Sequence, residues 1–137
     1  MLETALGRET RVERGPHIVV PLERLDPPAL RALAYARSIA GHRSLLVRDR
    51  RTAGELRRAG FDTTAEIVIG PADLDPVERV LRFLEQTDGD RPVAVVIPEV
   101  VPKRPWLYPL HDQTGLRLKL RLFFRPNTVV IDVPYHV

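Results

Sequence analysis

The sequence has 137 residues, enough for a single domain, and its 44% apolar and 28% charged residues are typical of a globular protein rather than a disordered tail or a fibre. It has no cysteine, which excludes disulfides, thiolate metal sites and cysteine nucleophiles. The net charge of +3, from 21 basic and 18 acidic residues, is too small to indicate a protein that binds nucleic acid.

The chain begins with a segment that carries little apolar surface. Residues 1–16 mix acidic residues with arginines, so we expect a flexible leader and place the folded domain at residues 17–137. The same mixture of charges argues against a signal peptide. No run of 18 apolar residues occurs, so we expect no transmembrane helix in the chain.

The first half of the domain alternates short apolar runs with helical segments. We expect buried strands at three runs, residues 17–22, 43–48 and 65–70. Asp26 and the two prolines after it predict the start of a helix that ends at Gly41. Residues 51–59 predict a second, shorter helix that ends at Gly60.

The second half continues the alternation. Asp75 and Pro76 have the features of a helix start, and apolar residues then recur at helical spacing. Residues 93–97 form the most apolar run of the chain and predict a central strand buried on both faces. Residues 128–135 predict the last strand.

Residues 111–125 fit two patterns. Their leucines alternate with basic residues, which is typical of a strand, whereas Leu116, Leu120 and Phe123 have the spacing of one helix face. We favour a helix, because residues 116–125 are strong helix formers without a β-branched side chain. A parallel sheet also requires a crossover at this point.

The alternation of strands and helices predicts an α/β fold, a three-layer sandwich with helices on both faces of a five-stranded parallel sheet. The handedness of the crossovers favours the flavodoxin-like strand order 3-2-1-4-5. Ligands of such sheets bind beyond the carboxyl ends of the strands, where the strand order reverses. The sequence therefore predicts a binding mouth at Pro21, Leu22, Glu23 and residues 98–103.

The motifs of phosphate binding are absent from this mouth. The sequence has neither GxGxxG nor GxxxxGK[ST], and no glycine lies between Gly89 and Gly115. Backbone amides cannot easily surround a phosphate without glycine, so we expect no tight binding of ATP or a dinucleotide. The four histidines show no metal-binding spacing, and we expect neither a metal, a cofactor nor an enzymatic activity.

Several polar and aromatic residues near the mouth are candidates for ligand binding. Glu99 follows the fourth strand and is either a functional carboxylate or, as we favour, a solvated or helix-pairing residue. Trp106 either covers the core or stacks on a ligand, and we favour the core. His111 and Asp112 are better explained as a helix start than as an acid–base pair. The candidate ligand-binding residues are Glu23, Glu99, Lys103, Trp106, His111 and Gln113.

The predicted last strand lies at an edge of the sheet. Its residues 128–133, from Thr128 to Val133, are β-branched and carry only the charge of Asp132. Such an edge tends to pair with another strand unless it is covered. We therefore expect a homodimer in which this segment meets its own copy across a two-fold axis. The alternative is that residues 1–16, or the loop that contains Trp106, cover the edge.

Three stretches resemble a known family. They are PEVVPKRPW at residues 98–106, LHDQTGLRLKLRL at 110–122 and VVIDVPYHV at 129–137. These stretches are similar to the carboxyl-terminal cytoplasmic domain of amino acid permeases of the amino acid–polyamine–organocation superfamily. The resemblance covers residues 17–137 and departs from the family at Asp112, where the family usually has asparagine.

The resemblance implies a fold similar to universal stress proteins and a non-catalytic regulatory domain at the inner face of the cell membrane. Its partner would be the transmembrane domain of a transporter, in cis or in trans, and residues 1–16 would be the juxtamembrane linker. Universal stress proteins often bind ATP through a glycine-rich loop that this sequence lacks. In some potassium-importing relatives the domain receives cyclic di-AMP. The alternative is a free-standing, nucleotide-binding protein of the universal stress type.

Overall fold

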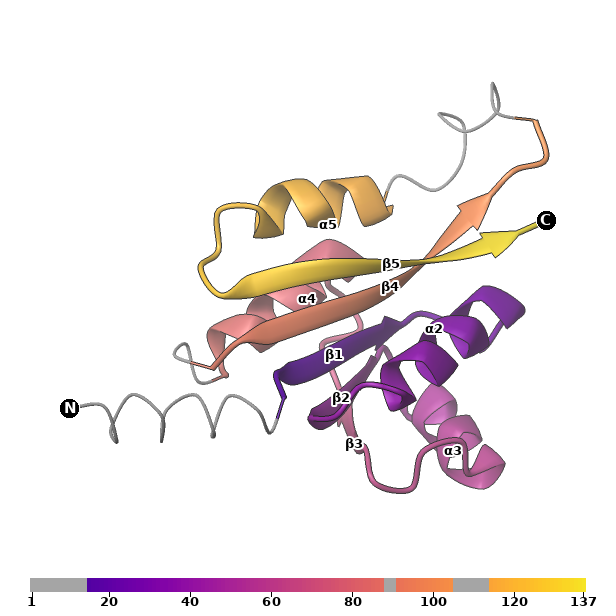
Figure 1. The fold of residues 1–137 in the computed structure, drawn as a ribbon. Coiled ribbons are helices and arrows are strands. Elements are labelled where there is room, and N and C mark those ends of the chain that lie inside the picture. Colours follow the sequence, from indigo (N-terminus) through magenta and orange to yellow (C-terminus); the bar gives the residue numbers. More distant parts are fainter. Residues whose placement is uncertain (1–14, 88–90, 105–113) are drawn as a thin grey trace.

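The computed structural model describes residues 15–87, 91–104 and 114–137, and these form one parallel sheet between two layers of helices (Figure 1). The elements follow in the order β1 (His17–Leu22), α2 (Pro27–Arg37), β2 (His42–Val47), α3 (Arg50–Ala59), β3 (Glu66–Ile69), α4 (Pro76–Glu85), β4 (Val93–Val101), α5 (Thr114–Leu122) and β5 (Thr128–His136). The strand order is β3-β2-β1-β4-β5, which confirms the predicted topology. Within the described part of the chain, no helix is long and apolar enough to cross a membrane.

The helices begin where aspartates accept hydrogen bonds from backbone amides. Asp26 Oδ1 accepts from the amide of Ala29 at 3.0 Å, and Asp75 Oδ1 accepts from the amide of Val77 at 2.8 Å. Both aspartates precede prolines, whose missing N–H is no loss in the first turn. The two helix starts predicted from the sequence are therefore confirmed.

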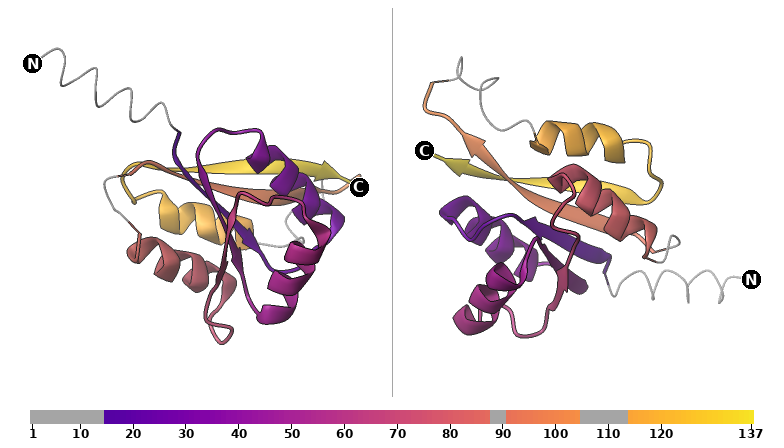
Figure 2. Two further views of the ribbon diagram at one scale, coloured as in Figure 1. Left: turned by 90° about the horizontal axis from the view of Figure 1, so that it is seen from below. Right: turned by 180° about the vertical axis from the view of Figure 1, so that it is seen from behind.

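Each face of the sheet has its own core. Helices α2 and α3 cover one face, and α4 and α5 cover the other (Figure 2). Central strand β1 contributes to both, because Ile18 packs toward α2 and α3 whereas Val19 packs toward α4 and α5. Leu118 and Leu122 of α5 are buried in the second core. The ambiguous segment is thus a helix over residues 114–122, and residues 111–113 lie outside the described part.

Strand β4 is longer than its apolar run. The sequence predicts a strand that ends at residue 97, but β4 stays paired with β5 as far as Val101. Pro98 is tolerated within it because the pairing of β4 with β1 ends at Val95, so only the β5 side of the strand is bonded there.

A histidine is buried at the amino end of the sheet. His17 is 8% exposed, and its Nε2 lies 2.7 Å from Ser44 Oγ. Its ring is 5.1 Å from that of His42 and 5.9 Å from that of Phe83, measured between centroids. Burial, together with the charges of His42 and Arg91, lowers the pKa of His17 from 6.5 to about 4.

The fold should therefore lose stability in mild acid. Between pH 6.5 and pH 4 the unfolded chain binds a proton at His17 that the folded chain does not, so the free energy of unfolding falls as the pH falls. From the pKa of about 4, we expect a loss of about 2 kcal/mol between pH 7 and pH 4.5. Urea denaturation at the two pH values measures this loss.

The variant His17→Asn should abolish most of this pH dependence, whereas His136→Asn, at an exposed position, should preserve it. An equal pH dependence in the wild type and His17→Asn would show that other groups cause the loss.

Candidate functional site

A cleft of about 620 Å³ opens at the carboxyl ends of β1 and β4. The strand order reverses at this point, since β1 pairs with β2 on one side and β4 on the other. The cleft is lined by Pro21, Leu22, Glu23, Arg24, Asp26, Pro28, Ala29, Arg48, Pro76, Val80, Ile97, Pro98, Val100, Thr114, Gly115 and Leu118. Five of these residues, Pro21, Leu22, Glu23, Pro98 and Val100, were expected at the mouth.

The electrostatic character of the cleft suits an anion. Three helices begin at it, because residues from the first turns of α2, α4 and α5 all line its wall. Helix amino termini carry partial positive charge, but Asp26 and Asp75 already accept hydrogen bonds from the first free N–H groups of α2 and α4, so the full charges decide the character of the cleft. Arg24 and Arg48 add two full charges from the ends of β1 and β2.

Neither of these two arginines forms a short ion pair with another residue of the described ranges. Arg24 is 82% exposed in its side chain and lies 3.8 Å from Asp26, a long distance for an ion pair. Arg48 is exposed and makes no hydrogen bond or ion pair with any residue of the described ranges. Both side chains are therefore available to an anionic ligand.

Glu23 has a structural partner. Its carboxylate accepts a hydrogen bond from Arg79 of α4, whose side chain is 4% exposed. Arg79 also donates to the carbonyl oxygens of Pro71 at 3.0 Å and Leu74 at 2.7 Å. The pair therefore ties the end of β1 to the loop after β3, so Glu23 shapes the wall of the cleft and its charge is neutralised.

The ion pair between Glu23 and Arg79, which we call the brace, passes beside Gly70. A methyl group on this residue would lie 2.5 Å from Arg79 Cγ, so the absence of a side chain creates the passage for the Arg79 stem. Gly70 is fixed in turn by a hydrogen bond from its amide to the carbonyl oxygen of Val47 at 2.9 Å.

Glu99 lies beside the cleft, under α5. Lys119 Nζ is 3.0 Å from Asp132 Oδ2 and 4.0 Å from Glu99 Oε1. The lysine thus bridges carboxylates on neighbouring strands and fastens α5 to the sheet. Asp132 Oδ1 is buried and accepts no hydrogen bond from the described residues. Glu99 is therefore a helix-pairing residue in this structure, as the sequence favoured.

The remaining candidates are spread out. Lys103 is exposed just after β4 and does not line the cleft. Trp106, His111 and Gln113 lie outside the described residues. The sequence analysis missed Arg48, although it comes at the carboxyl end of a predicted strand, where the same rule that selected Glu23 would have found it.

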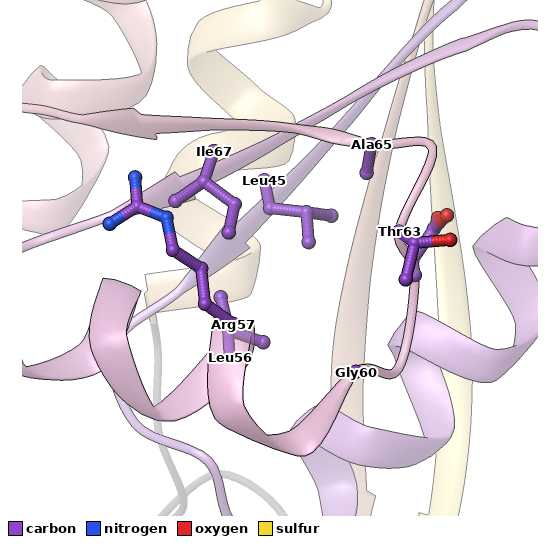
Figure 3. Close-up of a pocket in the computed structure, with 8 residues that line it drawn as sticks. Leu45, Leu56, Arg57, Gly60, Thr63, Ala65 and Ile67 are labelled. Atoms are coloured by element: carbon purple, nitrogen blue, oxygen red, sulfur yellow. The ribbon is translucent and has the colours of Figure 1, made fainter.

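A smaller pocket of about 320 Å³ lies between α3 and β3 (Figure 3). Leu45, Leu56 and Ile67 form its apolar lining, and the side chain of Arg57 extends along it. Asp62 at its edge is held by Arg43 Nε at 2.5 Å, and this hydrogen bond lowers the pKa of Asp62 to about 2. The pocket lies away from the switch point, and we regard the larger cleft as the functional site.

The described part of the chain brings together no group of three or more His, Asp or Glu side chains that would hold a metal ion.

Comparison with known proteins gives two findings. A family described as the KimA potassium transporter C-terminal domain matches residues 13–135. The potassium transporter KimA of Bacillus subtilis (strain 168) is 25% identical over 151 residues, which cover 97% of this chain and 25% of the transporter. The chain thus spans about a quarter of that relative's length. The expectation of a transporter's carboxyl-terminal domain is confirmed, but both matches are named for potassium transport and neither for amino acid transport.

Two glycine-to-alanine substitutions should change the free energy of unfolding in opposite directions, because only Gly70 lies against the Arg79 side chain. Gly70→Ala should destabilise the protein by about 1–3 kcal/mol, because Arg79 must shift to accommodate the methyl group. Gly54→Ala is the control: it lies inside α3, where the added Cβ meets Arg58 Nη1 at 3.4 Å. Alanine there should stabilise the helix by about 0.5–1 kcal/mol.

Urea denaturation of both variants measures the difference. If Gly70→Ala is as stable as the wild type, Arg79 is not confined as the structure indicates.

Proposed function

Because the chain belongs to the family of the KimA potassium transporter C-terminal domain, we propose that it is a non-catalytic regulatory domain of a potassium transporter. The transported substrate would then be potassium, and not the amino acid that the sequence resemblance implied. The domain would lie on the cytoplasmic side, at the inner face of the cell membrane. Its partner would be the membrane part of the transporter, in cis or in trans.

We propose that regulation works through an anionic ligand in the cleft. The supporting observation is that Arg24 and Arg48 both line the cleft and that neither is tightly paired. The volume of about 620 Å³ is within the range of sites for small ligands. Apolar residues such as Pro21, Pro98 and Val100 offer contact surface to flat rings.

Cyclic di-AMP fits this chemistry. It carries two phosphates for the two arginines and two purine rings for the apolar wall. The same nucleotide is the ligand that the sequence resemblance implied.

ATP fits less well. The stretch from residue 90 to 114 has no glycine. Residues 98–101 continue β4 and pair with β5, so they form a strand where universal stress proteins place a phosphate-binding loop. This observation favours the transporter domain over a free-standing, ATP-binding protein of the universal stress type.

Ligand binding is tested by thermal unfolding. Cyclic di-AMP should raise the midpoint of unfolding, with a stabilisation of about 2.7 kcal/mol at a hundredfold excess over its dissociation constant. ATP at the same concentration should leave the midpoint nearly unchanged. Arg48→Ala should lower the affinity for cyclic di-AMP by roughly tenfold, because it removes a charged hydrogen bond.

The control for this experiment is Arg58→Ala, which removes an exposed arginine of α3 that does not line the cleft. Stabilisation by ATP that equals that by cyclic di-AMP, or an unchanged response in Arg48→Ala, would contradict the proposal.

We also propose that the domain is a homodimer through the β5 edge, from Thr128 to Val133. β5 is a nine-residue strand at the edge of the sheet, with β4 as its only strand neighbour in the described residues. A charge at Val130 would disturb the core, since this residue packs into the second core, whereas Val129 is 58% exposed.

The variant Val129→Asp should therefore separate a dimer into monomers without unfolding the domain, because two like charges would meet along the paired edge. Sedimentation velocity measures the change. A monomeric wild type at high concentration would show that the edge is covered within one chain.

A further inference from the structure

Helix α5 is apolar on two opposite faces. Leu118 and Leu122 point into the core, where each is at most 2% exposed. The outward face carries an apolar row that we call the outer stripe, which continues just past the end of the helix. It consists of Leu116, Leu120, Phe123 and Phe124, which are 54%, 62%, 79% and 85% exposed.

The charges of α5 lie along its sides and are already paired. Arg117 is 3.1 Å from Asp75 and Arg121 is 2.8 Å from Glu78, which fastens this side of the helix to α4. Lys119 on the other side is paired with Asp132. These three cations are paired, whereas Arg125, which follows Phe124, donates to Thr128 Oγ1 and to the carbonyl oxygen of Leu84 and has no carboxylate partner among the described residues.

Such a helix has the pattern of one that is buried on both sides. Contiguous exposed apolar patches mark interaction sites. The two phenylalanine rings also pack edge to face, with centroids 5.1 Å apart, and so form one protruding apolar unit. We expect a partner with a complementary apolar surface.

The position of the stripe indicates which partner. β5 begins at Thr128, which pairs with Val93, and Val93 pairs with His17 at the start of β1. Phe123 and Phe124 precede β5 by a few residues, so they lie at the same end of the sheet as the start of β1 (Figure 1). In a carboxyl-terminal domain, the preceding polypeptide joins at the start of β1.

We infer that the outer stripe docks against the membrane part of the transporter polypeptide, the portion that precedes this domain. This inference rests on the proposed function and names the surface through which it acts. The partner supplies an apolar protein surface that covers Leu120 and the two phenylalanines.

Helix α5 then connects the ligand to the partner. Its first residues, Thr114 and Gly115, line the cleft together with Leu118. Its far end carries the phenylalanine pair. A ligand that contacts the start of the helix thus touches the same rigid element that docks on the membrane part, and a small shift of this helix is a known form of regulatory movement.

Cross-linking tests the docking. The chain has no cysteine, so Phe123→Cys provides one attachment point for a benzophenone maleimide within the domain, and any cysteine of the transporter's membrane part is replaced by serine. The whole chain replaces the matched quarter of the Bacillus subtilis transporter, and the chimera is placed in nanodiscs. The control is Ala34→Cys, at an exposed position on α2 in the opposite layer.

Illumination should join position 123, and not position 34, to a peptide of the transporter's membrane part. An adduct to a second copy of the domain, an adduct to lipid, or a yield equal to that of the Ala34→Cys control would overturn the inference.

A second variant separates this inference from the proposed function. Leu120→Ser in the isolated chain should unfold as the wild type does and keep its stabilisation by cyclic di-AMP, since the side chain is 62% exposed and does not line the cleft. In the chimera the same substitution should reduce the adduct from position 123. A reduced adduct with no nucleotide response in either protein would support the docking surface and reject the ligand, whereas an unchanged adduct with a normal response would do the reverse.

Discussion

Strand β1 pairs with β2 on one side and with β4 on the other, so the chain winds away from it in opposite directions. Helices α2 and α4 consequently lie on opposite faces of the sheet, and they diverge at the carboxyl ends of β1 and β4. The cleft lies at this point. The proposal that the cleft binds an anion depends on this arrangement, because it brings Arg24 and Arg48, at the ends of two strands, beside the start of α5.

The cationic side chains around the cleft differ in whether they are paired with a carboxylate or carbonyl oxygen. Arg79 is buried and makes hydrogen bonds to a carboxylate and two carbonyl oxygens, so it is a structural group. Lys119 serves the same purpose under α5. Arg48 has no comparable partner among the described residues, and a solvated arginine at the rim of a cleft can bind a ligand without first breaking a structural contact. The division between paired and unpaired cations is what distinguishes the scaffold from the site.

The sequence predicted the fold well because its signals are local. Aspartate–proline helix starts and short β-branched runs place most of the elements, and the handedness of crossovers then leaves few topologies. The location of the binding mouth could be predicted from that topology. The brace between Glu23 and Arg79 could not be predicted, because the two residues are 56 positions apart and no periodic pattern links them. The extent of β4 was also missed, since the prolines after residue 97 suggested a loop, while the missing pairing with β1 makes Pro98 harmless.

The two faces of α5 show the same limit of local reasoning. Leucines at every second position indicated either a strand or a helix, and only the packing shows which of them are buried. The exposed row was not foreseen, because a single sequence gives no sign of which apolar residues lack a neighbour. Its exposure is the observation from which we infer a docking partner.

The central claim is that this cleft holds an anionic nucleotide, and amide chemical-shift mapping tests it most directly. On titration of the isotope-labelled chain with cyclic di-AMP, we expect shifts confined to the ends of β1 and β2 and to the start of α5, with Arg24, Arg48 and Gly115 among them. Shifts centred on the pocket between α3 and β3, or an unchanged spectrum at millimolar nucleotide, would contradict the claim.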